Sequence, residues 1–489
     1  ERYADLADVT SDERPICYYL QSLAYQTLVS RFTARCGYWQ VGGAIGFRDQ
    51  LQDAVALIGI CPDKVAEHIK LCAEHQFLSG DVLHWWHPPA VGVRTRICDD
   101  RLFLAYALCE YVEQTGDRSL LKASAFYLKD RPVPENAPSL YAAFERGDVS
   151  ENILSHALRA VRSVRLSERG LVLMGGGDWN DGFDKLGEKG RGESVWCSMF
   201  LYYVLGKLSA YAEGEDVRYM ERTRMKLYAA VRACYKGDRY IRAFDDEGRA
   251  IGVEESDECR IDSLVQSWAV ISGISAGEEA RRVLRRAVER LADDEHKLIK
   301  LLDPPFREAS DKRVGYIADY PEGVRENGGQ YTHAAVWLVW ALYEADMTED
   351  ADRLLRYLLP SEHARTPEDV ERYLREPYVL AGDVYSGKLA GRGGWSWYTG
   401  GAGWLYRLIK EKYYGIRVRG DGVSFSPHIP KGKKVRLEVR IPSGRFELEI
   451  DGRSEGRWKV YVGGRGYAGM TMPFSSLAGK KVRVCRESR

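Results

Sequence analysis

The spacing of apolar residues changes once along this chain, and that change limits the folds available to it. Up to about Gly415, apolar side chains recur every three or four residues, as in amphipathic helices. From Ile416 on they alternate with polar residues between the turn signals SGR, DGRSEG and GGRG, as in strands. The sequence therefore predicts a long helical region followed by a short β region.

The helical region contains about a dozen segments with this spacing. Their ranges are Ile16–Arg35, Leu51–Ile58, Pro62–Phe77, Arg101–Thr115, Pro138–Val164, Val195–Glu213, Val217–Cys234, Ile261–Ser272, Ala276–Lys300, Thr332–Ala345 and Glu349–Leu359. The predicted strands are VRLEVRIP, RFELEIDG, RWKVYVGG and KKVRVCRES.

Helix hairpins followed by a small β region favour an (α/α)6 toroid, in which two concentric rings of helices place their loops around a site. An irregular helix bundle would give the same pattern. We expect an N-terminal extended segment over 1–14, the barrel over 15–415 and a C-terminal β domain over 416–489.

Composition excludes several classes of protein. Lys plus Arg and Asp plus Glu both number 71, so no basic surplus is present to bind nucleic acid. No apolar run approaches the roughly 20 residues that cross a bilayer, and no signal peptide is evident. The ten cysteines form no CxxC pair and the nine histidines show no ligand spacing, so we expect reduced thiols, a cytoplasmic protein and no metal site.

The aromatic residues are the informative part of the composition. Many of the 12 Trp residues lie beside Gly, Asp, Asn or His instead of aliphatic residues. Such rings suit a concave site for sugars, whose C–H faces stack on aromatic rings while their hydroxyls need hydrogen-bond partners. Packed corner aromatics are the alternative. Five polar, Gly-rich segments carry them: Gly37–Asp53, His84–Asp100, Gly175–Trp196, Tyr320–Trp337 and Asp383–Trp404.

These five segments, in this order, resemble glycoside hydrolase family 94, which comprises inverting glycoside phosphorylases and the phosphorylase-like part of cyclic β-1,2-glucan synthases. The resemblance covers about Arg14 to Pro430, and RENGGQYTH and GRGGWSWYTG are closer to the β-1,2-glucan branch. It implies an (α/α)6 barrel with a C-terminal β domain. The family's large N-terminal β-sandwich has no counterpart in this sequence, so we expect a homodimer or a complex with a separate chain that supplies it.

The segment DWNDG, from Asp178 to Gly182, has two interpretations from its residues alone. It fails the EF-hand pattern, because the fifth position is Gly182. It is either a turn with Asx capping or a carboxylic acid beside an indole, where low dielectric raises the pKa. The resemblance implies that Asp181 is the general acid that protonates the glycosidic oxygen. It also implies that Trp179 and Asn180 line the sugar pocket.

An inverting hydrolase needs a second carboxylate to activate water. Phosphate is already an anionic nucleophile, so a phosphorylase does not need that second carboxylate. Cations and backbone N–H groups are expected opposite the acid instead. The resemblance assigns this role to His333, Thr399 and Gly400, with Arg94 also reaching phosphate. From the residues alone, Thr399–Gly400 is equally a tight helix start and His333 a structural histidine.

Further polar groups are expected to bind the sugars. Arg96, Asp99 and Asp100 in RTRICDD are either sugar ligands, as the resemblance implies, or a buried ion-pair cluster. Arg48 and Asp49 in GFRDQ are either binding groups or a helix-start network. Glu326 and Gln330 in RENGGQ are expected on the acceptor side, and Arg392 either binds phosphate or positions its loop.

Three functions follow from these segments. The first is an inverting phosphorylase that converts a β-linked gluco-oligosaccharide and phosphate into α-glucose 1-phosphate and a shortened sugar. The second is an inverting hydrolase, for which Asp383 or Glu326 would be the base. The third is a sugar-binding subunit that needs a partner chain. No organic cofactor is suggested, and inorganic phosphate is the expected co-substrate.

Overall fold

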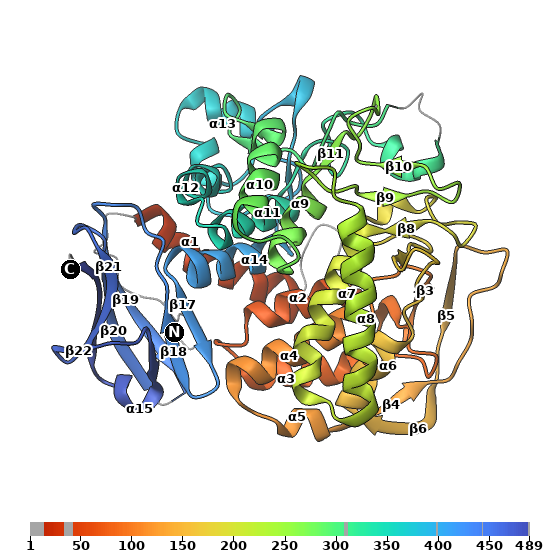
Figure 1. Ribbon diagram of the computed structural model, residues 1–489, viewed down its shortest axis with the longest axis horizontal. Helices are drawn as coiled ribbons and strands as arrows, with labels where there is room; N and C mark the ends of the chain where they lie inside the picture. Colours follow the sequence, from red (N-terminus) through yellow and green to blue (C-terminus); the bar gives the residue numbers. More distant parts are fainter. Residues whose placement is uncertain (1–13, 34–42, 308–311, 398–399, 443, 488–489) are drawn as a thin grey trace.

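A computed structural model describes residues 14–33, 43–307, 312–397, 400–442 and 444–487 of the chain. Helices form most of the molecule up to residue 413, and strands form the remainder (Figure 1). The C-terminal strands gather at one end, on the left of Figure 1, and short strands between helices gather at the other.

Six helices are buried on almost every side. Most of their sequences are apolar around the whole helix, as in THAAVWLVWALYE, so they can only occupy the interior. The first of them, FRDQLQDAVA, instead buries polar side chains, namely Arg48, Gln50, Gln52 and Asp53. Each contacts the next along the chain and the last contacts the first, so the contacts close into a ring. We call this set the inner helices: α2 (Phe47–Ala56), α4 (Leu102–Thr115), α7 (Val195–Leu208), α9 (Ser263–Ile271), α11 (Thr332–Glu344) and α14 (Gly401–Arg407).

Six further helices pack outside the ring against the inner helices, and two of them, α3 and α10, each contact two neighbouring inner helices. Five of them follow their inner partner in the sequence, whereas α1 comes first in the chain and packs against α14, the last. These outer helices are amphipathic or polar, so one face packs inward and the other faces water. They are α1 (Arg14–Thr27), α3 (Pro62–Ala73), α6 (Ile153–Arg162), α8 (Gly214–Ala233), α10 (Gly277–Leu291) and α12 (Thr348–Tyr357). Short helices α5 (Ser119–Lys122) and α13 (Pro367–Tyr373) lie in connections.

Two predicted helices extend too far. The helix predicted over Ala276–Lys300 ends at Leu291 and is followed by two short strands. The helix predicted over Pro138–Val164 is wrong over its first half. That half forms strands β5 (Ser139–Ala143) and β6 (Arg146–Asn152), and only α6 is helical. Strand β5 pairs with β3 (Val91–Thr95) and β6 with β4 (Ser124–Leu128). These partners are distant in sequence, so tertiary pairing overrides the local spacing. The Asn152 side chain then caps α6 by accepting the N–H of Ser155.

Short strands join the outer helices to the starts of the inner ones. One sheet has the order β1-β2-β3-β5 and another β10-β9-β8-β7. Three further pairs are β11 with β14, β12 with β13, and β15 with β16. The bounds are β1 (Ile45–Gly46), β2 (Leu83–His87), β7 (Val172–Leu173), β8 (Glu193–Ser194), β9 (Ala243–Phe244), β10 (Ala250–Ile251), β11 (Ile261–Asp262), β12 (Ala292–Asp293), β13 (Leu298–Ile299), β14 (Leu302–Asp303), β15 (Gln330–Tyr331) and β16 (Asp383–Val384).

The C-terminal strands form two sheets, and the four strands predicted from the sequence are all present as β19, β20, β21 and β24. Three strands, β17 (Ile416–Arg419), β18 (Gly422–Phe425) and β23 (Thr471–Pro473), form the smaller sheet. The larger sheet has the order β19 (Lys434–Ile441), β20 (Gly444–Asp451), β24 (Lys481–Glu487), β21 (Arg457–Val462), β22 (Arg465–Tyr467). Helix α15 (Phe474–Leu477) follows β23.

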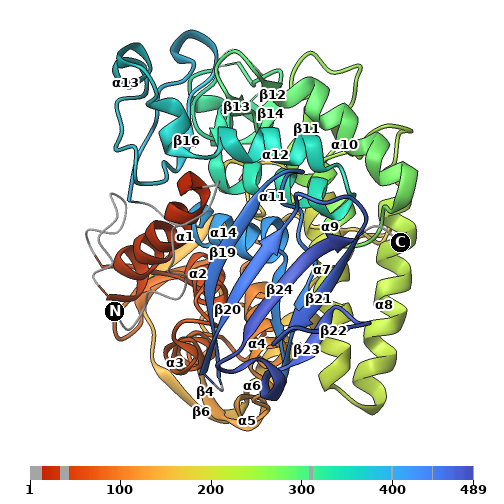
Figure 2. The ribbon, with the colours of Figure 1, turned by 90° about the vertical axis from the view of Figure 1, so that its left-hand side faces the viewer.

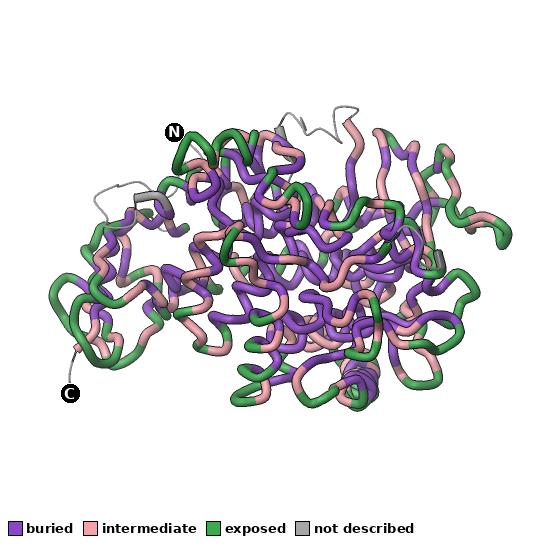
Figure 3. Tube along the Cα trace, turned by 90° about the horizontal axis from the view of Figure 1, so that it is seen from above, coloured by how far each residue is buried: buried purple, intermediate pink, exposed green. Residues whose placement is uncertain are grey.

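These sheets cover one end of the ring of inner helices. Strand β17 contacts α4 and the π-helix η9 (Leu408–Tyr413) that continues α14. Figure 2 shows the C-terminal strands in front of the helices. Buried residues run from the centre of the helical part into the sheets (Figure 3). Over the described residues, no helix combines the length and the apolar character needed to span a bilayer.

The outer helix α8 offers a matched test of this packing. Leu227 is fully buried, whereas Met225 is 74% exposed on the same helix. We expect Leu227→Ala to lower the free energy of unfolding by about 2–5 kcal/mol, because it leaves a cavity. Met225→Ala should change it by no more than about 0.5 kcal/mol. Urea denaturation of both variants checks this, and equal midpoints would contradict the packing described.

Candidate active site

The predicted site residues come from segments at the starts of the inner helices. Arg48 is the second residue of α2, Asp99 and Asp100 precede α4, and His333 is the second residue of α11. The loop containing Asp181 precedes α7. A helix N-terminus carries a partial positive charge and unpaired N–H groups, so several such ends favour anionic groups and ligands.

Arg48 holds three of these segments together. Its Nη1 donates to Asp99 Oδ1 at 3.0 Å and to the backbone oxygen of Asp178 at 2.9 Å. Its Nη2 donates to Asp181 Oδ1 at 2.7 Å, and its Nε lies 3.6 Å from Asp100 Oδ1. The side chain is 7% exposed. A planar guanidinium with its donors in a fixed fork therefore sets the relative positions of the loops before α4 and α7.

Asp181 begins the short 3-10 helix η3 (Asp181–Phe183), which Asn180 caps by accepting the N–H of Gly182 at 3.0 Å. The Asp181 side chain is 35% exposed to solvent, yet protein atoms surround its carboxyl group closely enough to desolvate it. This burial raises its pKa, and the attraction of Arg48 and His84 only partly offsets the effect. The carboxyl thus combines access from solvent with a tendency to hold its proton.

Asp178, three residues earlier, has the opposite environment. It is fully buried and receives two hydrogen bonds from Arg242, at 2.7 and 2.8 Å, and one from Ser194 Oγ at 2.6 Å. Burial works against ionisation here too, but Arg242 and Ser194 outweigh it and lower the pKa of Asp178. One loop therefore carries two carboxyl groups whose pKa values are pushed apart, which is the arrangement expected of an acid and its fixed, ionised neighbour.

Arg242 and Asp262 extend this buried network. Arg242 is fully buried, and its Nε lies 3.2 Å from Asp262 Oδ2. Asp262 also caps α9 by accepting the N–H of Leu264 at 2.7 Å. Burial raises the pKa of Asp262 to about 6. Sequence analysis missed Arg242, because nothing near it in the sequence indicates a partner 64 residues away.

His84 is a second residue that sequence analysis did not single out. Its Nδ1 lies 2.9 Å from Asp100 Oδ2, and its Nε2 lies 3.8 Å from Asp181 Oδ2. Burial opposes its charge, but Asp100 and Asp181 outweigh this and raise its pKa to about 9. His84 is therefore an imidazolium at neutral pH. The only local signal is its place in HWWH, one of the polar aromatic segments.

The charge of this cluster favours a protonated carboxyl. Four aspartates, at 49, 99, 100 and 181, face the two cations Arg48 and His84. With every group ionised, two negative charges would be uncompensated. Burial and the neighbouring Asp100 also raise the pKa of Asp99. A proton held by this cluster relieves the repulsion, and Asp181, unlike the buried Asp99 and Asp100, has access to solvent.

Trp179 and His333 lie together beside the start of α14. The Trp179 indole N–H donates to His333 Nδ1 over 3.4 Å, and the two ring centroids are 5.3 Å apart. Gly400 has φ of 87°, and a Cβ there would lie 3.2 Å from His333 Nδ1. Its N–H donates to Asp53 Oδ1 at 3.0 Å. Thr399, the expected partner of Gly400, lies outside the described residues.

Glu326, which was expected on the acceptor side, belongs to a separate cluster with Arg325, Trp395 and Asp383. Its Oε2 lies 3.1 Å from Arg325 Nε, and Arg325 stacks over the Trp395 ring at 4.3 Å. Burial raises the pKa of Glu326, and it raises the pKa of Asp383 to about 6. Asp383 Oδ2 accepts the N–H of Arg325 at 3.2 Å. Gln330 faces elsewhere: its Oε1 accepts the N–H of Ile299 at 2.8 Å, joining β15 to β13.

Contrary to the expectation from the sequence, the hydrogen bonds of Arg94 and Arg96 go to groups outside this cluster. Arg94 donates to Asp81 at 2.6 Å and to Asp130 at 2.7 Å. Arg96 donates to the backbone oxygen of Pro134 at 2.6 Å. Both arginines therefore anchor neighbouring strands and loops through these hydrogen bonds. Within the described ranges, no three His, Cys, Asp or Glu side chains group as metal ligands.

Residues 20–415 match the model of the Glycosyl hydrolase 94 superfamily, catalytic domain. The chain is 40% identical over 444 residues to the cyclic β-(1,2)-glucan synthase NdvB of Rhizobium meliloti, covering 88% of this chain and 16% of that protein. It is 31% identical to the solabiose phosphorylase of Paenibacillus borealis, covering 88% of this chain and 54% of that protein. The chain thus spans about half of that phosphorylase and less of the synthase.

Solved structures show the same fold at low identity. A GH78 family rhamnosidase of Bacillus sp. GL1 superposes with a TM-score of 0.55 at 12% identity, over 92% of this chain and 42% of that one. A GH63 mannosylglycerate hydrolase from Thermus thermophilus gives a TM-score of 0.52 at 12% identity, over 79% of this chain and 99% of that one.

The buried pair of Arg242 and Asp178 can be tested through stability. We expect Arg242→Met to lower the free energy of unfolding by about 3–5 kcal/mol, because it leaves a buried carboxylate without its partner. The control is Arg249→Met, whose ion pair with Asp245 is at 2.7 Å but whose side chain is 48% exposed. The control should cost at most about 1 kcal/mol. Urea unfolding compares the two, and a cost for Arg242→Met no larger than for the control would contradict the network.

Proposed function

Because this chain belongs to the glycoside hydrolase 94 superfamily, as its five Gly- and Trp-rich segments predict, we propose that it is the catalytic part of an inverting glycoside phosphorylase. We further infer that the ring of inner helices and the six helices outside it are the (α/α)6 barrel expected over 15–415. The strands from 416 on are then the C-terminal β domain.

The observation that carries this proposal is the environment of Asp181. Its carboxyl is open to solvent on one side, lies 2.7 Å from Arg48, and has a raised pKa. A general acid needs access to the glycosidic oxygen and a proton to give at neutral pH. Asp178, buried and bound by Arg242, suits a fixed role in holding the loop. Asp181 is therefore the acid in this proposal.

Phosphate is expected on the side of His333 and Gly400, away from the four aspartates around Arg48. The cluster around Arg48 already has more carboxyl groups than cations, so a phosphate dianion placed there would be repelled. At the starts of α11 and α14, by contrast, two helix N-termini lie beside an imidazole. Because the Trp179 N–H donates to His333 Nδ1, the neutral imidazole carries its hydrogen on Nε2.

The reaction follows from these positions. Asp181 gives its proton to the glycosidic oxygen as the bond from that oxygen to the anomeric carbon breaks. A phosphate oxygen forms a new bond to the same carbon from the opposite face, so a β-glucoside gives α-glucose 1-phosphate. No cofactor takes part, and phosphate is the co-substrate. The likeness to a cyclic β-(1,2)-glucan synthase supports β-1,2-linked gluco-oligosaccharides as the first substrates to test.

The test is release of glucose 1-phosphate from a panel of β-linked gluco-oligosaccharides, with and without inorganic phosphate. We expect release only when phosphate is present. Free glucose formed without phosphate would instead favour an inverting hydrolase, with Glu326 or Asp383 as the base. Sugar binding without turnover in both buffers would favour a binding subunit.

Within that assay, Asp181→Asn should reduce phosphorolysis by roughly 10²–10⁴-fold, because the amide cannot donate a proton in place of the acid. The control is Glu188→Gln on the same loop, whose side chain is 59% exposed and pairs with Lys185. Normal turnover by Asp181→Asn with unchanged folding would show that the acid is another residue.

The pH dependence provides a separate prediction. The protonated form of Asp181 is active, so kcat/KM should fall as pH rises through its pKa. His84 is one of the charges that lower this pKa. His84→Asn removes that charge, so the alkaline limb of the profile should move to higher pH. His87→Asn on the same strand is the control. An alkaline limb that stays in place, or moves to lower pH, would contradict the coupling.

A further inference from the structure

The net charge of zero conceals a strong polarity between two parts of the chain. The segment from Lys431 to Glu487 contains every strand of the larger C-terminal sheet, and it has fourteen Lys or Arg and six Asp or Glu residues. Because the whole chain is neutral, the other residues carry an excess of eight acidic groups. A basic β region is therefore attached to an acidic helical region.

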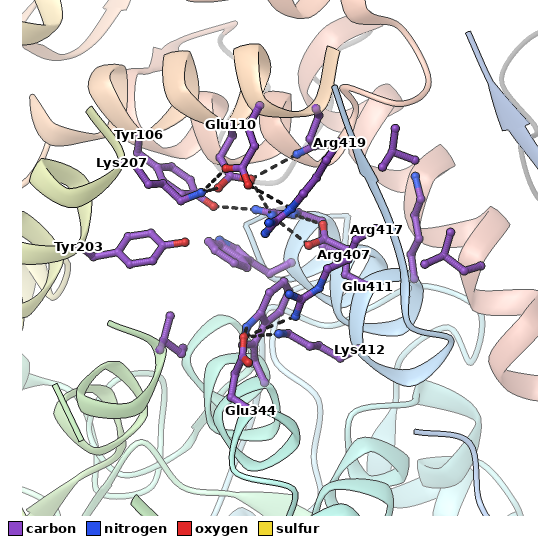
Figure 4. Close-up of a pocket in the computed structure, with 18 of the residues that line it drawn as sticks. Tyr106, Glu110, Tyr203, Lys207, Glu344, Arg407, Glu411, Lys412, Arg417 and Arg419 are labelled. Carbon is purple, nitrogen blue, oxygen red and sulfur yellow. Dashed lines mark hydrogen bonds and ion pairs between the residues drawn. The ribbon is translucent and has the colours of Figure 1, made fainter. Parts of the chain in front are cut away.

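The basic residues nearest the helices lie outside this segment and are engaged inside the molecule. On β17, Arg417 Nη2 lies 3.6 Å from Glu344 Oε1 at the end of α11. Arg419 Nε lies 3.1 Å from Glu113 Oε1 near the end of α4. Figure 4 shows both arginines at a small pocket where the inner helices end. The smaller sheet thus uses its charges to join the helices.

The larger sheet directs its charges away from the helices. Along β19 and β20, apolar side chains such as Leu437 and Leu448 are buried, and charged residues alternate with them. Alternate side chains of a strand lie on opposite faces, so the charged ones share the outer face. Figure 2 shows this sheet in front of the helices. We call its outer side the basic face, with these Lys and Arg residues: Lys434, Arg436, Arg440, Arg445, Arg457, Lys459, Lys481 and Arg483.

All six acidic residues of the segment already pair with Lys or Arg of the same segment. Glu438 lies 2.6 Å from Arg445, and Glu487 lies 2.8 Å from Lys459. Glu449 lies within 3.4 Å of three basic side chains. The other three acids are Glu447, Asp451 and Glu455. With every acid compensated, the basic groups of this segment still outnumber the acidic ones by eight.

Part of this excess is concentrated at one end of the sheet. Arg440 and Arg445 stand directly opposite each other where the β19–β20 hairpin turns. Like charges in such positions destabilise a sheet. Lys480 and Lys481 lie beside them, because the N–H of Gly479 donates to the backbone oxygen of Arg445 at 2.7 Å. We call these four residues the basic end. An anionic partner would relieve their mutual repulsion.

We propose that the basic face and the basic end dock this protein onto the surface of a bilayer that contains anionic lipids. Such a surface has a negative potential that attracts clusters of Lys and Arg. Lipids are mobile, so anionic headgroups gather at the basic side chains and leave the paired glutamates facing neutral lipids. The acidic helical region is repelled and points away from the bilayer, which leaves the end of the ring with Asp181 open.

The same face is poorly suited to nucleic acid. The phosphates of a duplex have a fixed spacing, so some of them would lie against Glu438, Glu447 and Glu449 in the middle of the face. Single strands are held by stacking on several aromatic rings. Among the described residues of the basic face, Tyr461 is the only aromatic one. Docking on lipid does not depend on the function proposed for the site around Asp181.

The test is co-sedimentation of the 489-residue chain with vesicles of phosphatidylcholine, alone or mixed equally with phosphatidylglycerol. We expect the protein to sediment with the mixed vesicles at low salt and to stay in solution with phosphatidylcholine alone. In 1 M NaCl, where the screening length falls to about 3 Å, the bound protein should be released.

Two matched variants locate the surface. Removing three charges at the basic end, with Arg440→Gln, Lys480→Gln and Lys481→Gln, should weaken binding to the mixed vesicles at least tenfold, because basic groups near an anionic surface each add attraction. The control removes three exposed charges from α8, with Arg218→Gln, Arg222→Gln and Lys226→Gln, and should bind as the wild type does. Thermal unfolding establishes that both variants are folded.

Three results would overturn the proposal. The first is a wild-type protein that does not sediment with the mixed vesicles at low salt. The second is equal binding by the two variants, since the charges of the basic end would then have no special part. The third is retention of the wild type by duplex DNA of random sequence under conditions in which the vesicles do not bind it, which would assign the basic face to nucleic acid.

Discussion

The burial of six helices against one another, most of them apolar on every side, determines where everything else in this protein lies. Helices such as α11 have no polar face and can be covered only by other protein, so the six form a closed ring and amphipathic helices surround it. Within the ring, the starts of the helices gather at one end and their ends gather at the other. Arg48 and His333 belong to the first end, and Glu110 and Glu344 to the second.

At the first end, a continuous line of buried charges positions the candidate acid. Asp262 contacts Arg242, Arg242 holds Asp178, and the backbone oxygen of Asp178 accepts from Arg48, which in turn contacts Asp181. Each buried charge is stable only because the next one compensates it. The loop therefore has little freedom to move. It places one carboxyl where ionisation is favoured and another where burial raises the pKa.

The two ends of the ring carry different charged side chains. Helix N-termini at the candidate site favour anions and helix C-termini at the opposite end favour cations, which agrees with the aspartates around Arg48 at one end and with Lys207 and Arg407 at the other. Packed rings connect the two ends. The Arg407 guanidinium lies over the Trp404 ring, whose centroid lies 6.4 Å from that of His333 at the candidate site.

The sequence by itself determined the helical and β regions, the strands β19, β20, β21 and β24, and the family, because these depend on local spacing and on long contiguous segments. Tertiary structure decided which charges meet. Arg48 and Arg94 both lie in segments rich in aspartate, yet one reaches Asp181, 133 residues away, and the other turns to Asp81 and Asp130. His84 and Arg242 likewise acquire their roles only from partners on other elements. Local spacing cannot specify such pairs, because the packing of the inner helices brings their segments together.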